Sequence, residues 1–150
     1  MTSVAVIGDG QMGLVLADAL VYKGAKVSLW GPFQEEIEQL AASRTSPRLA
    51  ELTLDDAITV TADGHEALDG VDVVINAIPT QFIRRVWSSL ASELPSGVPV
   101  GCVAKGIEIE TLMLPTQILE EAIGQGHATC VLSGPTIATE LVRRQPAVMV

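Results

Sequence analysis

The sequence predicts an α/β fold, with a doubly wound, mostly parallel sheet and helices on both of its faces. Short β-branched runs alternate along the chain with longer stretches of helical periodicity, and several of the runs are continuous in Val, Ile and Ala. Continuous apolar runs are typical of parallel strands buried on both faces, and strand–helix–strand units close by right-handed crossovers. The expected strands are Ser3–Ile7, Lys26–Trp30, Ala57–Val60, Asp72–Ala77, Val98–Val103, Thr129–Leu132 and Ala147–Val150.

Apolar residues at helical spacing place helices between these strands. The repeating residues are Met12, Val15, Leu16, Ala19 and Leu20 in the first helix, Ile83, Val86, Trp87, Leu90 and Ala91 in the second, and Leu114, Ile118, Leu119, Ala122 and Ile123 in the third. We expect Gly124 to end the third helix, and Asp63 with Glu66 to open a short helix that ends at Gly70. The irregular stretch Ser43–Asp56 is expected to be a surface excursion.

Length and composition restrict the class of protein. The chain has 150 residues, which fits one domain over residues 1–150, and its 48% hydrophobic and 18% charged residues are a globular composition. The net charge of −9, from 9 Lys+Arg and 18 Asp+Glu, argues against a nucleic-acid partner. No apolar run reaches the roughly 18–20 residues of a membrane span, and no basic segment opens a signal peptide, so we expect a cytoplasmic protein.

The cysteines and histidines do not indicate a metal site. Cys102 and Cys130 lie in expected strands, where a free cysteine behaves as a small buried hydrophobe. His65 and His127 have no partner at ligand spacing, so we expect structural roles for both.

A glycine-rich turn follows the first expected strand and opens the first helix. Its sequence, G-D-G-Q-M-G, matches the G-x-G-x-x-G pattern of a Rossmann-type dinucleotide site. In that pattern the first glycine permits the turn, the second lets the backbone approach the pyrophosphate, and the third lets the helix pack on the strand; these are Gly8, Gly10 and Gly13. The free amides of Gln11 and Met12 would then face the phosphates at the positive end of the helix.

The choice between NAD and NADP is read from the charges near this turn. The second strand ends in Leu-Trp-Gly-Pro-Phe, with neither the acid that binds the ribose of NAD nor the arginine that suits NADP. Glu35 and Glu36 follow, and we expect both to be solvated. Their charge favours NAD over NADP. Because a carboxylate beside a pyrophosphate is repelled, Asp9 is expected to point away or to weaken binding.

Three later segments are expected to complete the site at the carboxyl ends of the strands. Pro79 ends the fourth strand and precedes Phe82, which either stacks on the cofactor or packs within its helix. Lys105 follows the fifth strand and suits an anionic ligand, and Glu108 and Glu110 after it are expected to be solvated partners and not catalytic acids. The segment Ser133–Thr136 is expected to open a helix at Pro135, giving either a second anion site or a simple cap. If the fifth and sixth strands are neighbours, Lys105 and Thr136 are expected to converge on one pocket.

These segments together resemble the N-terminal half of NAD(P)-dependent glycerol-3-phosphate dehydrogenase. The most specific matches are Ala104–Glu108 with Thr111-Leu112, Leu132–Thr136 with Ala138, Glu140 and Leu141, Ala77–Phe82, and Leu29-Trp30. The resemblance implies reduction of dihydroxyacetone phosphate to sn-glycerol 3-phosphate with NADH or NADPH, in glycerophospholipid synthesis. It also implies a homodimeric full-length protein and a helical C-terminal domain, absent from these 150 residues, that carries the general-acid lysine.

The resemblance implies roles for individual residues. Lys105 would contact both cofactor and substrate, and Gly134 and Thr136 would contact glycerol phosphate. The cofactor contacts would include Gln11, Met12, Pro32 and Ala138. The sequence departs from the family at Asp9, at Gln11-Met12, and at Pro32, where many members have a basic residue.

Two alternative functions stay open at this point. One is a related 3-hydroxyacid dehydrogenase of the same superfamily, and the other is a nucleotide-sensing module without catalysis. Because Val148–Val150 has the pattern of a strand that is just beginning, we expect the chain to be part of a longer enzyme. We expect the 150 residues to bind cofactor but to turn over poorly by themselves.

Overall fold

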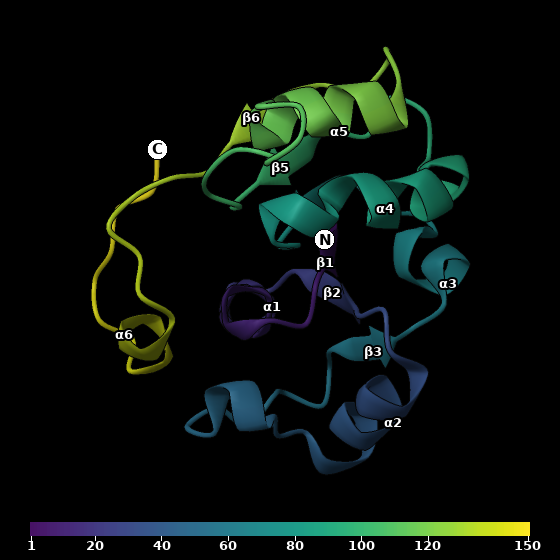
Figure 1. Cartoon of the computed structure of the whole chain (residues 1–150). Coiled ribbons are helices and arrows are strands. Elements are labelled where there is room, and N and C mark those ends of the chain that lie inside the picture. Colours follow the sequence, from purple (N-terminus) through teal and green to yellow (C-terminus); the bar gives the residue numbers. More distant parts are fainter.

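The computed structural model describes residues 1–150 and places six strands in one sheet, in the order β3-β2-β1-β4-β5-β6 (Figure 1). Every neighbouring pair is parallel. The chain builds outward from β1 in one direction and then returns to build from β4 in the other, so the switch point lies between β1 and β4. The strands are β1 (Ser3–Ile7), β2 (Lys26–Trp30), β3 (Thr59–Thr61), β4 (Val73–Asn76), β5 (Val100–Cys102) and β6 (Thr129–Val131).

Helices cover both faces of this sheet, which confirms the predicted doubly wound α/β class. Residues alternate along β1, so that Ala5 and Ile7 join one apolar cluster while Val4 and Val6 join the other. The first cluster includes buried residues of α3, α4 and α5, and the second those of α1, α2 and α6. Figure 1 shows α4 and α1 on either side of β1. The helices are α1 (Gln11–Tyr22), α2 (Gln34–Ser43), α3 (Gly64–Leu68), α4 (Thr80–Leu90), α5 (Pro115–Ile123) and α6 (Ala138–Val142), with short 3-10 turns at Pro47–Leu49 and Ala91–Glu93.

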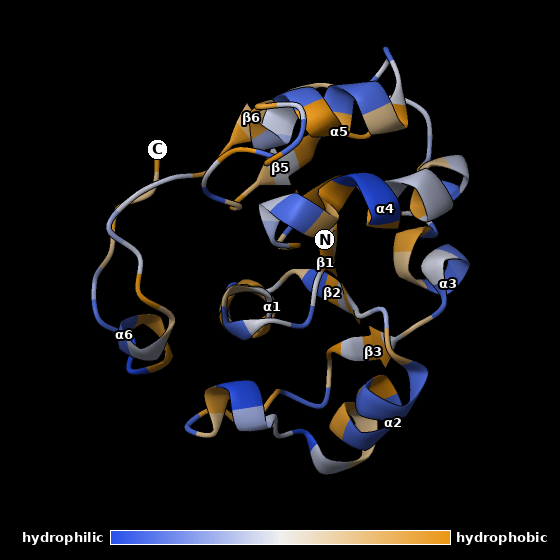
Figure 2. Cartoon of the chain, viewed as in Figure 1, coloured by the Kyte–Doolittle hydropathy of each residue, from blue (hydrophilic) through white to orange (hydrophobic).

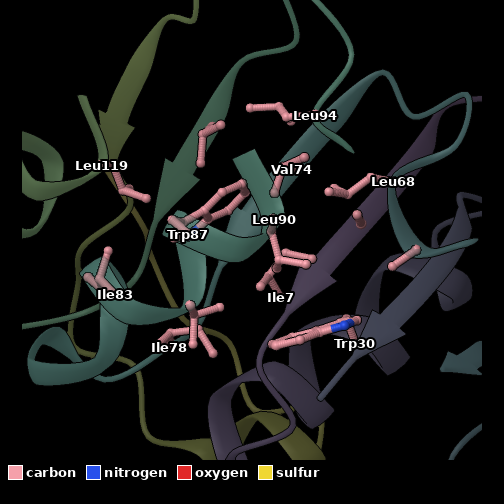
Figure 3. Packing of buried hydrophobic residues seen from close by; sticks show 14 of the residues in the cluster. Ile7, Trp30, Leu68, Val74, Ile78, Ile83, Trp87, Leu90, Leu94 and Leu119 are labelled. Atoms are coloured by element: carbon pink, nitrogen blue, oxygen red, sulfur yellow. The ribbon is translucent and has the colours of Figure 1, made fainter. Parts of the chain in front are cut away.

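Helix α4 alternates hydrophobic and hydrophilic residues, as the bands along its ribbon show (Figure 2). Its apolar residues face the sheet, and Trp87 is fully buried between α4 and the strands (Figure 3). The Trp87 Nε1–H donates to Asn76 Oδ1 at 2.8 Å, and Asn76 Nδ2 donates to Cys102 Sγ at 3.3 Å. Burial raises the pKa of the Cys102 thiol, which therefore stays protonated. This buried network joins α4, β4 and β5 at the carboxyl ends of the strands.

Several sequence predictions about the chain's later part are wrong. Ala147–Val150 is not a strand, although Val150 exchanges two backbone hydrogen bonds with Ser133, at 2.8 and 2.9 Å. No helix begins at Pro135, because α6 starts three residues later at Ala138. Cys130 is exposed, since β6 lies at the edge of the sheet.

Two earlier expectations also need correction. The strand expected at Ala57–Val60 is shifted to Thr59–Thr61. The stretch Ser43–Asp56 is more than a surface excursion, because it buries three leucines against the core beside α2. These are Leu49, Leu52 and Leu54. No helix in the structure combines the length and apolar character that a membrane span requires.

We predict that Asn76→Ala lowers the free energy of unfolding by about 1–3 kcal/mol, because the buried indole N–H of Trp87 loses its acceptor. Urea unfolding followed by circular dichroism measures the change. In a double-mutant cycle with Trp87→Phe, the paired variant should lose less stability than the sum of the single losses. Strictly additive losses of stability in the paired variant would show that Asn76 and Trp87 do not stabilise the fold through their shared hydrogen bond.

Candidate functional site

A cavity of about 290 Å³ opens at the switch point, where α/β sheets of this type bind ligands. The turn after β1, the segments after β2 and β4, and the first turns of α4 form its wall. Five of the residues predicted for cofactor binding lie together in this wall: Gly8, Gly10, Pro32, Pro79 and Phe82.

The three glycines of the turn are required for different reasons. Gly8 has a φ of +123°, and a Cβ placed on it would lie 2.8 Å from the Ala77 carbonyl. A Cβ on Gly13 would lie 1.8 Å from the Gly8 carbonyl oxygen. A Cβ on Gly10 would meet no atom within 4 Å. Protein packing therefore demands Gly8 and Gly13, whereas Gly10 leaves a bare stretch of backbone facing the cavity.

The start of α1 offers hydrogen-bond donors to a ligand. Gly10 is the N-cap and no side chain caps the helix. The main-chain amides of Gln11, Met12 and Gly13 donate to no protein acceptor, so the positive end of the helix is free to bind an anion. The Gln11 side chain turns away and donates from Nε2 to the Arg48 carbonyl oxygen at 2.7 Å. The Gln11 side chain is therefore held by the protein, and only its main-chain amide is left without a partner.

Asp9 points away from the helix start, toward the end of β2. A Cβ placed on Gly31 would lie 2.9 Å from Asp9 Cγ. The Asp9 carboxylate is only 11% exposed, and its Oδ2 accepts a hydrogen bond from Arg48 Nη1 at 3.1 Å. Arg48 also pairs with Glu36, and this hydrogen bond raises the pKa of the guanidinium, which stays charged. Of the two outcomes expected for Asp9, the structure shows the first.

Arg48 was not singled out from the sequence. It lies 39 residues from Asp9, in an irregular stretch with no periodic pattern. The pairing arises because three neighbouring leucines anchor that stretch, so that the turn Pro47–Leu49 lies over the start of α1. No spacing rule in the sequence indicates such a contact.

Two exposed aromatic side chains line the cavity. Phe33, after β2, and Phe82, in the first turn of α4, are each 51% exposed. The Arg85 guanidinium lies 5.8 Å from the centre of the Phe82 ring, within reach of a cation–π contact. Half of the Phe82 surface is therefore free of helix packing, and an aromatic ligand would find a stacking surface here.

Lys105 lies outside the cavity wall, exposed on the loop that follows β5. Helix α4 holds this loop. Thr80 Oγ1 donates to the Lys105 carbonyl oxygen at 2.7 Å. The Gln81 amide donates to the Ile107 carbonyl oxygen at 2.8 Å and accepts from the Ile109 amide at 3.1 Å. These contacts fix the backbone at Lys105 and leave its side chain free of protein partners.

A salt bridge completes the link between α4 and the loop. Arg84 donates to both oxygens of Glu108, at 2.9 and 3.1 Å, and also pairs with Glu121 of α5 at 3.1 Å. Glu108 was expected to be solvated, but it is buried. Its hydrogen bonds from Arg84 and Thr111 lower the pKa of its carboxyl.

The segment after β6 is a tight turn, which corrects the expected helix start. The Thr136 amide donates back to the Gly134 carbonyl oxygen at 2.8 Å. A Cβ on Gly134 would lie 2.1 Å from the Val148 carbonyl oxygen, so Gly134 permits a close crossing of two backbones. Thr136 and Ala138 are both buried. The expected convergence of Lys105 and Thr136 requires β5 and β6 to be neighbours. The structure confirms that these two strands are paired in the sheet.

The histidines have local partners, and neither lies in the cavity wall. His65 Nδ1 is 3.1 Å from Glu93 Oε2, and His127 Nδ1 is 2.9 Å from the Val98 carbonyl oxygen. No group of three or more His, Cys, Asp or Glu side chains is placed to hold a metal ion.

Comparison with known proteins identifies relatives of the whole chain. A family model described as the N-terminus of NAD-dependent glycerol-3-phosphate dehydrogenase matches residues 3–150. A Mycobacterium bovis protein named glycerol-3-phosphate dehydrogenase (NAD(P)+) 2 is 37% identical over 151 aligned positions, which cover 99% of this chain and 45% of that protein. The chain thus spans about 45% of the length of this relative.

Solved structures share the fold. Glycerol-3-phosphate dehydrogenase from Coxiella burnetii has a TM-score of 0.90 at 23% identity, over 99% of this chain and 45% of that one. The Saccharomyces cerevisiae enzyme of the same name has a TM-score of 0.79 at 26% identity, over 95% of this chain and 44% of that one.

We predict that the salt bridge between Arg84 and Glu108 stabilises the fold above the ordinary glutamate pKa of 4.5 and is lost as the pH falls through the lowered value. Below that range Glu108 is protonated in both states and the contribution is gone. Thermal unfolding measured downward from about pH 6 should therefore show Glu108→Gln less stable than wild type at the upper end, with the difference narrowing as the pH falls below the ordinary glutamate pKa of 4.5.

Glu110→Gln is the matched control, because Glu110 is exposed and has no ion pair. Its unfolding curve should follow wild type across the whole range. A constant deficit of Glu108→Gln at every pH would show that the salt bridge does not cause the effect.

Proposed function

The chain belongs to the family of the N-terminal domain of NAD-dependent glycerol-3-phosphate dehydrogenase, and from this premise we propose that it is the NAD(P)-binding part of an enzyme that reduces dihydroxyacetone phosphate to sn-glycerol 3-phosphate. NADH or NADPH is the reductant, and the product enters glycerophospholipid synthesis. Family membership favours this reaction over that of a 3-hydroxyacid dehydrogenase. A homodimer and a cytoplasmic location stay predictions.

The observation that carries the proposal is the bare backbone at Gly10. Packing within the protein excludes side chains at Gly8 and Gly13 but leaves Gly10 free. A ligand that approaches the backbone closely explains why no side chain stands there. The free amides of Gln11 and Met12 follow at once, so a diphosphate beside Gly10 would receive hydrogen bonds at the positive end of α1.

The remaining residues of the cavity suit the other parts of a dinucleotide. Pro32 lies at the end of β2, on the side where the adenosine belongs in this fold, and Pro79 and Phe82 lie beyond β4. Phe82 offers its exposed ring as a stacking surface. Bound NADH or NADPH supplies the hydride that the ketone carbon receives.

Lys105 is the residue that we assign to the substrate. Its free ammonium group lies at the carboxyl end of β5, where it would attract the phosphate of dihydroxyacetone phosphate and, in the transition state, the forming alkoxide. Because Thr80 and Gln81 fix the loop, this charge is held near one position. Gly134 and Thr136 belong to the same proposed phosphate site. The general acid that protonates the alkoxide is expected from the rest of the full-length enzyme.

We predict that Gly10→Ala raises the dissociation constant for NADH at least roughly tenfold, because the added methyl group stands where the diphosphate must approach. Titration followed by NADH fluorescence measures it. The variant should still fold, since the methyl group has no neighbour within 4 Å, and thermal unfolding checks this. Unchanged NADH affinity in a folded variant would refute the site.

We predict that Lys105→Gln weakens binding of glycerol 3-phosphate, in the presence of saturating NAD, by roughly tenfold or more, because a hydrogen bond to a charged partner is lost. Isothermal titration calorimetry gives the affinity. Lys26→Gln removes the same charge at the opposite end of the sheet, where Lys26 begins β2. Equal weakening by both variants would point to net charge and would contradict a specific contact.

A further inference from the structure

The end of β2 lacks the acceptor that a dinucleotide's adenosine ribose needs. In doubly wound domains an acidic side chain at this place binds the ribose hydroxyls. Here β2 ends at Trp30, and the residues that follow are Gly31, Pro32 and Phe33. None of these three side chains can accept a hydrogen bond. An acceptor must therefore come from elsewhere in the chain.

Asp9 brings a carboxylate to this position from the neighbouring turn. Its Cγ lies 2.9 Å from the point where a Cβ on Gly31 would stand, so the carboxylate occupies the space of the missing β2 side chain. Asp9 also lines the cavity beside Pro32 and Phe33. Its Oδ2 is held by Arg48, while its Oδ1 accepts no hydrogen bond from the protein. One oxygen is thus anchored and the other is available.

The charges around this carboxylate disfavour a phosphate. Arg48 is shared between Asp9 and Glu36, so one positive charge faces two negative charges. The Arg48 backbone is fixed as well, because Gln11 binds its carbonyl oxygen and Ser46 accepts from its amide at 3.2 Å. A 2′-phosphate would bring about two further negative charges to this place.

We propose that Asp9 is the acceptor for the adenosine ribose hydroxyls, and that the cluster Asp9–Arg48–Glu36 selects NAD(H) over NADP(H). The inference rests on the proposed dinucleotide site and adds the residue that sets its specificity. Arg48 acts as a positioning residue, since it orients the carboxylate and has no free charge to offer a 2′-phosphate.

The test compares NADH and NADPH in fluorescence titrations of the 150-residue chain. Wild type should bind NADH roughly tenfold or more tightly than NADPH. Asp9→Asn keeps the shape of the side chain and removes its charge, so the ratio of the two dissociation constants should fall roughly tenfold. Glu36→Gln should also lower the ratio, because Arg48 gains free charge and NADPH binds more tightly.

Glu35→Gln is the matched control. Glu35 lies beside Glu36 in the first turn of α2, and it is exposed and makes no ion pair with Arg48. Its removal of one negative charge should leave the ratio within about twofold of wild type. Thermal unfolding of each variant confirms that it is folded, and Glu36→Gln provides the second test if Asp9→Asn loses stability.

The outcomes separate this inference from the proposed function. If neither cofactor binds, the dinucleotide site itself is refuted and the inference falls with it. If both cofactors bind, wild type must prefer NADH, and Asp9→Asn or Glu36→Gln must shift the ratio more than Glu35→Gln does. An equal or inverted wild-type preference, or equal shifts in all three variants, would overturn the role of Asp9 and leave the site intact.

Discussion

The close contact between Gly13 and the Gly8 carbonyl is the constraint on which the rest of the site depends. A Cβ at position 13 would lie 1.8 Å from that oxygen, so only glycine fits there. With no side chain at this position, α1 can begin directly against the end of β1. This contact fixes the start of the first helical turn, whose amides donate to no protein acceptor. Asp9 lies between these two glycines and extends toward β2, where Arg48 donates a hydrogen bond to its carboxylate.

The central part of the fold was predictable because its signals are local. The apolar runs of β1 and β2 and the glycine spacing before α1 are each contained in a few consecutive residues, and the structure confirms all of them. The later part was predicted less well. Pro is permitted in a first helical turn, but Thr136 closes a tight turn on Gly134 instead. The exposure of Cys130 follows from the edge position of β6, which a short strand does not reveal.

The charged parts of the site could not be predicted, because their partners are far apart in the sequence. Asp9 and Arg48 are 39 residues apart, and Arg84 and Glu108 are 24 apart. Periodicity describes which face of an element is apolar, but it does not describe which exposed charges meet after folding. Glu108 was therefore expected to be solvated, although two hydrogen-bond donors and the α4 helix enclose it.

Helix α4 contacts both halves of the site, since it carries Phe82 at the cavity and holds the Lys105 loop through Thr80 and Gln81. Trp87 anchors the same helix to the sheet through Asn76. If a ligand at Phe82 shifted α4, the Lys105 backbone would shift with it, because Thr80 and Gln81 connect the two. The affinities of the proposed cofactor and substrate sites would then be thermodynamically linked, and each ligand would change the affinity for the other by the same factor.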